Sequence, residues 1–232
     1  MLAIIPARGG SKGLPRKNVK ILYDKPLVAY TIEAAKCSNS IDRIVLSTDD
    51  PEIAQIGIQH GAEVPFMRPQ ELAQDTSFVI DTYLYTIERL QREFNLCVGE
   101  FVALNPTTPL RKSQDIDQAV ELFVKRGADS VISCTQLHHP AEWIFTMRED
   151  GLTQKDVKVE FKKMMNRQES HPSFVPNGAV YVYRYSFLKE RYSYFSDKTY
   201  AYVMPAERSV DIDSELDFKF AEFLMGRRTV HD

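Results

Sequence analysis

Hydrophobic and polar residues follow two different periodic patterns along the chain between Leu2 and Gln136. Short apolar runs predict buried strands, and apolar residues three or four positions apart predict amphipathic helices. Strands are expected at Leu2–Pro6, Ile41–Thr48, Glu63–Arg68, Phe101–Leu104 and Ser130–Thr135. Helices are expected at Pro26–Cys37, at Pro51–His60 with Asp50 as N-cap, at Ser77–Phe94 and at Ser113–Arg126.

Strands that alternate with helices in this way predict a doubly wound, mostly parallel α/β sheet of the Rossmann-like type. Ligands of such folds bind beyond the carboxyl ends of the strands. Four polar segments are therefore expected along one rim of the sheet, namely residues 7–18, 48–50, 68–77 and 105–111.

The alternation of expected strands and helices is interrupted after Gln136. Residues 154–176 are polar and poorly periodic, which is consistent with a β-rich excursion, an oligomer contact or a lid. Strands resume at Asn177–Arg184 and Tyr200–Met204, and a last helix is expected at Glu215–Met225. Because no repeat or linker interrupts the chain, we expect a single domain over residues 1–232.

Composition narrows the class of protein. The chain has 232 residues, of which 44% are hydrophobic and 26% charged, and its formal net charge is −3. These values are typical of a globular protein, and the slightly acidic balance argues against general nucleic-acid binding. No apolar run approaches the ~18 residues of a membrane span. Cys37, Cys97 and Cys134 lack the spacing of a zinc site or a disulfide framework, which favours a reducing cytoplasm.

The loop after the first expected strand carries the most informative pattern. It holds three glycines, a hydroxyl at Ser11 and four cations, Arg8, Lys12, Arg16 and Lys17. Glycines let backbone N–H groups approach an anion, and Arg and Lys side chains neutralise phosphate oxygens. Neither GxxxxGK[ST] nor GxGxxG is present. The loop is predicted to hold a triphosphate, and a solvated glycine turn is the alternative.

This loop also carries a family resemblance. The string IPARGGSKGLPRKN at Ile5–Asn18 resembles the signature of the cytidylyltransferases that activate sialic acids and related nonulosonic acids. Similar strings follow in order, namely VLSTDD at Val45–Asp50, RPQELAQDTS at Arg68–Ser77, NPTTPLR at Asn105–Arg111, NRQ at Asn166–Gln168, PNGAVY at Pro176–Tyr181 and SVDIDSELDF at Ser209–Phe218. The resemblance thus extends over nearly the whole chain.

The resemblance implies a role for each matched residue. The catalytic residues would be Arg8, Lys12, Arg167 and Asp211. The nucleotide would be bound by Arg8, Gly10, Ser11, Lys12, Lys17, Asn18, Arg68, Asp75, Thr76 and Ser77. The sugar would contact Asn105, Arg111, Arg167 and Tyr181. The cluster Asp75-Thr76-Ser77 also suits the N-cap of the helix that follows, so both roles stay open.

Asp211 and Asp213 are the candidate metal ligands. Their spacing places both carboxylates on one face of an extended segment. Two such oxygen ligands, completed by phosphate oxygens and water, suit Mg²⁺ or Mn²⁺. In the alternative interpretation Asp213 caps the last helix and Asp211 is a surface charge. The resemblance favours the metal site.

The expected reaction transfers the cytidylyl group of CTP to a nine-carbon 2-keto acid sugar and releases pyrophosphate. N-acetylneuraminic acid is the first expectation. Legionaminic and pseudaminic acids remain open, because Asn105 stands where many sialic-acid enzymes have the longer Gln of QPTSPLR. The alternatives are a 3-deoxy-manno-octulosonate cytidylyltransferase and a non-catalytic nucleotide-binding regulator. Residues 154–176 resemble the family's dimerisation excursion, so a homodimer in the cytoplasm is expected, without nucleic acid or membrane as partners.

Overall fold

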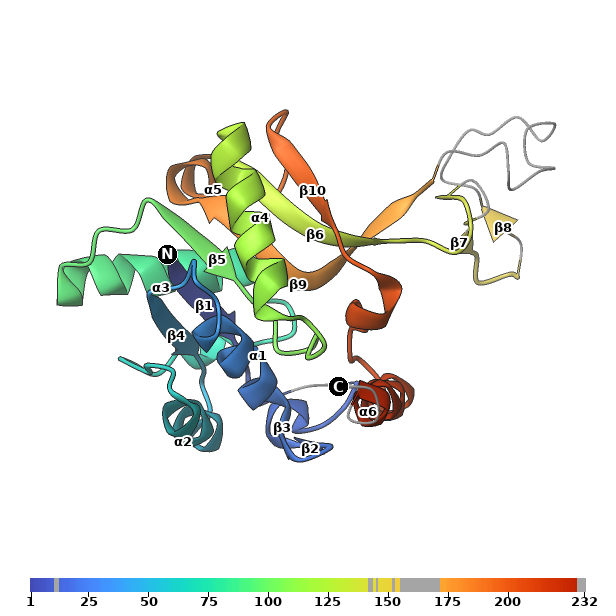
Figure 1. The fold of residues 1–232 in the computed structure, drawn as a ribbon, viewed down its shortest axis with the longest axis horizontal. Coiled ribbons are helices and arrows are strands. Elements are labelled where there is room, and N and C mark those ends of the chain that lie inside the picture. Colours follow the sequence, from blue (N-terminus) through green and yellow to red (C-terminus); the bar gives the residue numbers. More distant parts are fainter. Residues whose placement is uncertain (11–12, 142–143, 145, 152, 155–171, 229–232) are drawn as a thin grey trace.

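A six-stranded sheet forms the centre of this computed structural model, with the strand order β10-β6-β9-β5-β1-β4 (Figure 1). Its strands are β1 (Leu2–Pro6), β4 (Arg43–Ser47), β5 (Glu100–Ala103), β6 (Ser130–Gln136), β9 (Phe174–Arg184) and β10 (Thr199–Val203). The pairs are parallel except those of β9, which is antiparallel to β5 and β6. The predicted mostly parallel α/β class is confirmed. The structure describes residues 1–10, 13–141, 144, 146–151, 153–154 and 172–228.

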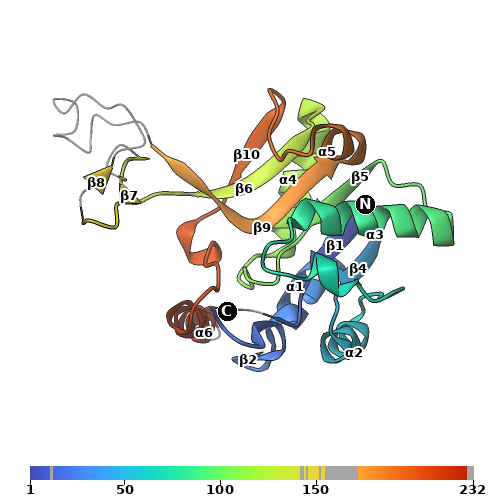
Figure 2. The same cartoon turned by 180° about the vertical axis from the view of Figure 1, so that it is seen from behind.

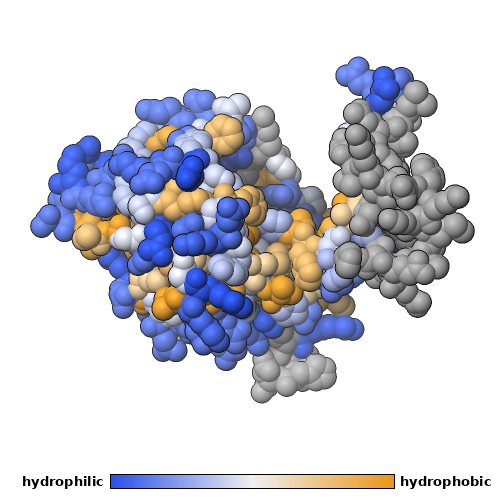
Figure 3. Space-filling model, turned by 90° about the horizontal axis from the view of Figure 1, so that it is seen from above, coloured by the Kyte–Doolittle hydropathy of each residue, from blue (hydrophilic) through white to orange (hydrophobic). Residues whose placement is uncertain are grey.

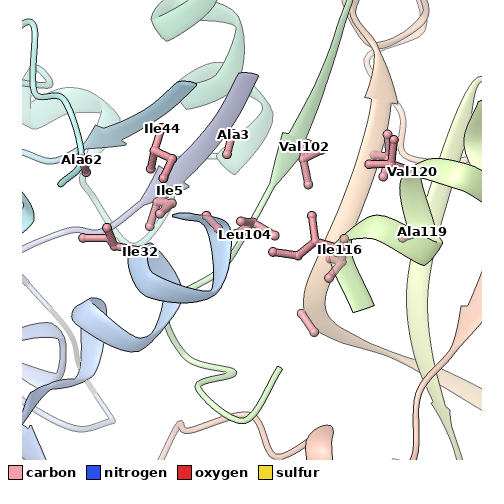
Figure 4. Packing of buried hydrophobic residues seen from close by; sticks show 14 of the residues in the cluster. Ala3, Ile5, Ile32, Ile44, Ala62, Val102, Leu104, Ile116, Ala119 and Val120 are labelled. Carbon is pink, nitrogen blue, oxygen red and sulfur yellow. The ribbon is translucent and has the colours of Figure 1, made fainter. Parts of the chain in front are cut away.

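Helices cover both faces of the sheet (Figures 1 and 2). One face carries α1 (Leu27–Lys36), α2 (Pro51–His60) and α4 (Ser113–Arg126), and the other carries α3 (Val79–Phe94) and α5 (Tyr185–Arg191). Alternation along β1 divides the core: Ala3 and Ile5 pack on the α1 side, whereas Leu2 and Ile4 pack on the α3 side. Figure 4 shows the first of these two clusters, with Ile32 of α1 beside Ile5.

The last helix, α6 (Glu215–Arg228), packs away from the central sheet (Figure 1). Its Phe218 and Met225 share a hydrophobic cluster with Leu14 of the glycine-rich loop. The same cluster includes Leu22 of the small hairpin formed by β2 (Ile21–Leu22) and β3 (Lys25–Pro26). Burial of these side chains therefore stabilises the packing of α6 against the glycine-rich loop.

Strands β6 and β9 continue together beyond the body of the molecule as an arm (Figures 1 and 2). The arm also carries a short hairpin, β7 (Thr146–Met147) with β8 (Thr153–Gln154). The expected excursion, residues 154–176, falls on this arm, and its residues 155–171 lie outside the described residues. Seen from above, hydrophobic side chains interrupt the hydrophilic surface of the body (Figure 3).

Two sequence expectations about the elements were wrong. Glu63–Arg68 is no strand, because only Glu63 forms a bridge, to Val45. Pro65 has no N–H to donate and limits further pairing there. Helix α3 begins at Val79 after Phe78, and no side chain caps it. The N-cap role expected for Asp75-Thr76-Ser77 is therefore not observed. Among the described residues, no helix is both long and apolar enough to cross a membrane.

Candidate active site

A cleft of about 300 Å³ opens at the carboxyl ends of β1 and β5. Three of the four segments expected along this rim contribute to its wall. The lining residues are Pro6, Arg8, Lys17, Asn18, Arg68, Leu72, Gln74, Asp75, Ser77, Val79, Thr82, Asn105, Pro106 and Thr107. The parallel arrangement of β1 and β5 explains this convergence, because their carboxyl ends meet at one edge.

The glycine-rich loop leaves β1 close to the end of β4. Its Ala7 N–H donates to the carbonyl of Ser47 at 3.0 Å, and its Gly9 N–H donates to Asp49 Oδ1 at 3.1 Å. A Cβ at Gly9 would lie 2.7 Å from Asp50 Oδ2, so only glycine fits there without a shift. Gly10 has open space around it, whereas Ser11 and Lys12 lie outside the described residues.

Arg8 reaches across the cleft to the opposite wall. Its Nη1 lies 2.8 Å from Asp75 Oδ1, and about a third of each side chain is exposed. An incoming phosphate group would offer Arg8 the same charge-assisted contact that Asp75 provides.

The two residues after Asp75 differ in their placement. Ser77 lines the cleft and donates to the carbonyl of Glu71 at 2.6 Å, whereas Thr76 is exposed outside the lining.

Asn18 and Arg68 both line the cleft, and each has one buried polar atom without a hydrogen bond among the described residues. Asn18 Nδ2 donates to the carbonyl of Arg8 at 2.9 Å, but its Oδ1 accepts no hydrogen bond from the described residues. The Nε of Arg68 likewise has no partner among them. Buried polar atoms are normally hydrogen-bonded, so an acceptor and a donor left over at one cleft fit a polar ligand.

Asp49 is a site residue that sequence reasoning missed. Its Oδ1 accepts hydrogen bonds from Gly9 N–H and from Arg68 Nη2, the latter at 3.2 Å. Burial lowers the pKa of Arg68, and Asp49 opposes that shift. One carboxylate oxygen therefore links the glycine-rich loop to the opposite wall. The string VLSTDD contained this residue, but nothing in its spacing distinguished it from Asp50, the N-cap of α2.

The late aspartates lie beside the same loop. Lys17 Nζ donates to the carbonyl of Ile212 at 2.8 Å and to Asp213 Oδ1 at 2.9 Å. The backbone of Gly13 packs so closely on the carbonyl of Asp213 that a Cβ would overlap it. The segment is also paired to the cleft wall, because Ile212 N–H donates to the carbonyl of Thr107 at 2.8 Å. Two regions separated by most of the chain thus meet at one site.

Asp211 is exposed, as the surface-charge alternative expected, and yet the protein packed around it disfavours its charge. The surrounding protein raises its pKa, and the negative charge of Asp213 adds to the shift. Hydrogen bonding with Thr107 and the charge of Lys17 act in the opposite direction. A carboxylate in this position gains from a nearby cation, which makes it suited to a divalent ion.

The alternative interpretation, in which Asp213 caps the last helix, is wrong. Ser214 and Asp217 cap α6 instead. The backbone N–H of Ser214 donates to Asp217 Oδ2 at 2.8 Å, and Asp217 N–H donates to Ser214 Oγ at 3.3 Å. This reciprocal pair is a capping box. The carboxylate of Asp213 is directed to Lys17 rather than to the helix.

The fit of Asp211 and Asp213 to Mg²⁺ rests on their donor chemistry. Each touches a different residue of the cleft wall, Thr107 and Lys17 respectively. In the part of the chain that the structure describes, no cluster of three or more His, Cys, Asp or Glu side chains suits a metal. Mg²⁺ commonly takes one or two carboxylates and completes its shell with phosphate oxygens and water, so this pair fits.

Two of the expected sugar-side residues, Asn105 and Tyr181, lie in or beside the middle of β9. Asn105 lines the cleft, and its N–H pairs with the carbonyl of Gly178 at 3.4 Å. A Cβ at Gly178 would lie 3.0 Å from Asn105 Nδ2, and the φ of +72° at Gly178 also favours glycine. Tyr181 accepts a hydrogen bond from Gly178 N–H at 3.1 Å, and burial raises its pKa. Because β9 is antiparallel to β5, its middle, from Gly178 to Tyr181, reaches the rim where β5 ends.

Arg111 does not line this cleft. Its side chain is buried behind the loop, where Nη1 donates to Thr31 Oγ1 at 2.6 Å and Nη2 donates to the carbonyl of Asn105. Burial lowers the pKa of Arg111 to about 9. In this structure Arg111 braces the Asn105 loop from behind, and its sugar contact stays a prediction. Arg167 lies outside the described residues.

Comparison with known proteins gives the site a context. The family described as Cytidylyltransferase matches residues 2–217. The chain is 36% identical to CMP-N,N'-diacetyllegionaminic acid synthase of Legionella pneumophila, over 97% of this chain and 96% of the relative. It is 38% identical to an N-acylneuraminate cytidylyltransferase of Streptococcus agalactiae, over 94% of this chain and 51% of that longer protein. A solved CMP:2-keto-3-deoxy-manno-octonic acid synthetase complexed with CTP has the same fold, with a TM-score of 0.72 and 14% identity over 98% of each chain.

Proposed function

The chain belongs to the cytidylyltransferase family, and we propose that it couples CTP to a nonulosonic acid to give the CMP-sugar and pyrophosphate. The observation that supports this most is the contact of Lys17 with Ile212 and Asp213, which joins the cation-rich loop to the carboxylates. Nucleotidyl transfer requires such an arrangement, because cations stabilise the charge that develops on the departing pyrophosphate.

In this proposal the anomeric hydroxyl oxygen of the sugar attacks the α-phosphorus of CTP. A new O–P bond forms, the bond to pyrophosphate breaks, and the hydroxyl proton is released. Arg8, Lys12 and Lys17 hold the triphosphate, and Arg8 exchanges Asp75 for a phosphate oxygen when CTP enters. The leftover acceptor of Asn18 and donor of Arg68 serve the nucleotide, since cytosine presents both an amino donor and ring acceptors.

We further propose that Asp211 and Asp213 hold Mg²⁺, or Mn²⁺, together with the triphosphate. When bound, the ion would neutralise phosphate charge and fix the geometry of the α-phosphate. Lys17 keeps Asp213 in position through a contact of 2.9 Å. The hydrogen bond between Asp211 and Thr107 holds the other carboxylate at the cleft wall.

The sugar side rests on Asn105, Tyr181 and, as further predictions, Arg111 and Arg167. N-acetylneuraminic, legionaminic and pseudaminic acids are the candidates. The relative from Legionella pneumophila, named for diacetyllegionaminic acid, aligns over 96% of its own length, and this supports a diacetylated sugar beside N-acetylneuraminic acid. The 3-deoxy-manno-octulosonate alternative is less well supported, because its solved representative shares only 14% identity with this chain.

Turnover of a sugar panel tests the proposal. The protein is incubated with CTP, Mg²⁺ and each sugar in turn, and pyrophosphate release is measured alongside the mass of the CMP-sugar. Release with one nonulosonic acid and not with 3-deoxy-manno-octulosonate is the expected result. Thermal shifts with CTP, UTP, GTP and ATP then separate a cytidylyltransferase from an enzyme of another nucleotide, since a bound ligand stabilises by mass action. Stabilisation by CTP without turnover of any sugar would favour the regulator.

We also propose a cytoplasmic homodimer that uses the arm. Large hydrophobic side chains on the arm and near its base are exposed, including Phe174, Val175, Met147 and Val203. Exposed apolar clusters of this kind mark interfaces. Cys37, Cys97 and Cys134 are all free thiols, which suits a reducing compartment. Light scattering at working concentration should give twice the chain mass, and Phe174→Asp should shift it toward the monomer.

A further inference from the structure

An ion pair between a buried carboxylate and a partly buried arginine lies behind the carboxylate segment and outside the lining of the cleft. Asp115, near the start of α4, is only 1% exposed, and it faces Arg208 at the end of a short 3₁₀ helix (Ala206–Arg208). Arg208 Nε lies 3.1 Å from Asp115 Oδ2, and Nη2 lies 2.8 Å from Oδ1. This is the bidentate geometry in which Arg holds a carboxylate most firmly.

Asp115 is hydrogen-bonded by more than this arginine. Tyr202 of β10 donates to its Oδ1 at 3.0 Å, and the N–H of Lys112 donates to its Oδ2 at 2.8 Å. The carboxylate thereby joins three elements, β10, the 3₁₀ helix and the beginning of α4. A buried carboxylate with this many donors is fixed in place.

The ion pair forms one end of a clamp on the segment that carries Asp211. At the other end, Ile212 N–H donates to the carbonyl of Thr107 at 2.8 Å. Thr107 and Asp115 belong to one stretch of chain, and Arg208 and Ile212 belong to another that runs beside it in the opposite direction. Asp211, three residues beyond Arg208, is held between the two ends.

Asn177 fastens the middle of the clamp. Its Nδ2 donates to Ser209 Oγ at 2.9 Å, and its carbonyl accepts from Thr108 Oγ1 at 3.0 Å. Both partners belong to the two stretches that the clamp joins. The direction in which the chain enters Asp211 is therefore set by side chains that do not line the cleft.

We propose that Arg208 is a positioning residue that, through its ion pair with Asp115, sets the Asp211 carboxylate for the divalent ion of the nucleotide complex. This inference rests on the proposed function. Arg208 touches no reacting group in the proposal and acts through the backbone of residues 209–211. A displacement of about 1 Å at a charged site is sufficient for a large loss of rate.

The test separates ion binding from turnover. Mn²⁺ is titrated into the protein with CTP and without sugar, and free Mn²⁺ is followed by electron paramagnetic resonance. Arg208→Met is expected to weaken Mn²⁺ binding about tenfold and to lower kcat by a similar factor, while the Kd for CTP without metal stays within about twofold. Arg208→Lys should recover part of both losses, because the ammonium group still pairs with Asp115 as a point charge.

Two further variants guard against a general loss of folding. Tyr202→Phe removes one donor to Asp115 and keeps the ion pair, so it should show a smaller effect in the same direction. Arg43→Met is the matched control, because Arg43 makes a similar two-point pair with Glu63, at 2.9 Å and 2.7 Å, beside the amino end of β4. It should leave Mn²⁺ binding unchanged.

Each outcome has a distinct meaning. Unchanged Mn²⁺ affinity in Arg208→Met, or an equal loss in Arg43→Met, would overturn the positioning role. Absence of turnover in the unaltered protein with every sugar would instead overturn the proposed function, and the ion titration would still report on the clamp.

Discussion

The ammonium group of Lys17 lies 2.9 Å from the carboxylate of Asp213, although 196 residues separate them in sequence. Lys17 belongs to the glycine-rich loop, and Asp213 belongs to the segment before α6. The pair places the cation of a cleft-lining residue in direct contact with a carboxylate just outside the lining. In the proposed function the triphosphate and its divalent ion would bind beside this pair.

Replacement of Lys17 by Gln tests whether this contact serves binding more than folding. The Asp213 side chain is 78% exposed, so solvent screens the pair and its loss should lower the free energy of unfolding by less than about 1 kcal/mol. The KM for CTP should rise about tenfold, because a charge-assisted phosphate contact is lost. Urea unfolding and steady-state kinetics measure the two effects. A large loss of stability with unchanged KM would assign Lys17 to folding.

Gly13→Ala tests the close packing of the loop on the carboxylate segment. A Cβ at this position would overlap the carbonyl oxygen of Asp213, so the two segments must move apart. We expect a loss of about 1–3 kcal/mol in stability, as for other overpacked sites, and a fall in kcat/KM. Gly99→Ala is the control, because a Cβ at Gly99 meets nothing within 4 Å. Equal behaviour of the two variants would contradict the packing.

Asp211→Asn should abolish most turnover and yet stabilise the fold at neutral pH. The pKa of Asp211 is raised above its usual value of 3.8. At pH values between the usual and the raised pKa, the folded state therefore retains a proton that the unfolded state has already lost. Stability therefore falls as pH rises from the usual value through the raised one, and it stays lower above that window. The Asn variant lacks this penalty. Its unfolding midpoint in urea should exceed that of the original protein at pH 7, and the advantage should disappear below pH ~3, where Asp211 is largely protonated in both states.

Turnover supplies the second readout for the same variant. Loss of one carboxylate ligand should reduce kcat about 10²-fold or more, in line with the removal of other electrostatic groups from active sites. An Asn variant that is less stable at pH 7, or that retains full turnover, would count against the place assigned to Asp211.

Asp49→Ala should weaken the nucleotide end of the cleft selectively. Its carboxylate accepts from Gly9 N–H and from Arg68, whose buried charge would lose its partner. The KM for CTP is expected to rise about tenfold or more, with the KM for the sugar changed much less. Asp42→Ala is the control, because Asp42 pairs with the amino terminus and its side chain is 87% exposed. A parallel rise in both KM values would show a general distortion of the cleft.

Local signals in the sequence were sufficient for most of the fold. The apolar runs at Leu2–Pro6 and Ser130–Thr135 predicted β1 and β6, and the Asp50-Pro51 pair predicted the start of α2. These features depend on periodicity and on capping, which act over a few residues. The glycine-rich loop was identified for the same reason, because its glycines and cations are neighbours in sequence.

The tertiary structure alone decided which distant groups meet. The pairing of β9 between β5 and β6, which brings Gly178 beside Asn105, depends on long-range hydrogen bonds that no local pattern encodes. The shared acceptor at Asp49, the burial of Arg111 behind its loop and the pair of Asp115 with Arg208 depend on it too. Charge and spacing in the sequence therefore specified the chemistry available to this protein, whereas the packing of α6 and β9 determined where that chemistry is assembled.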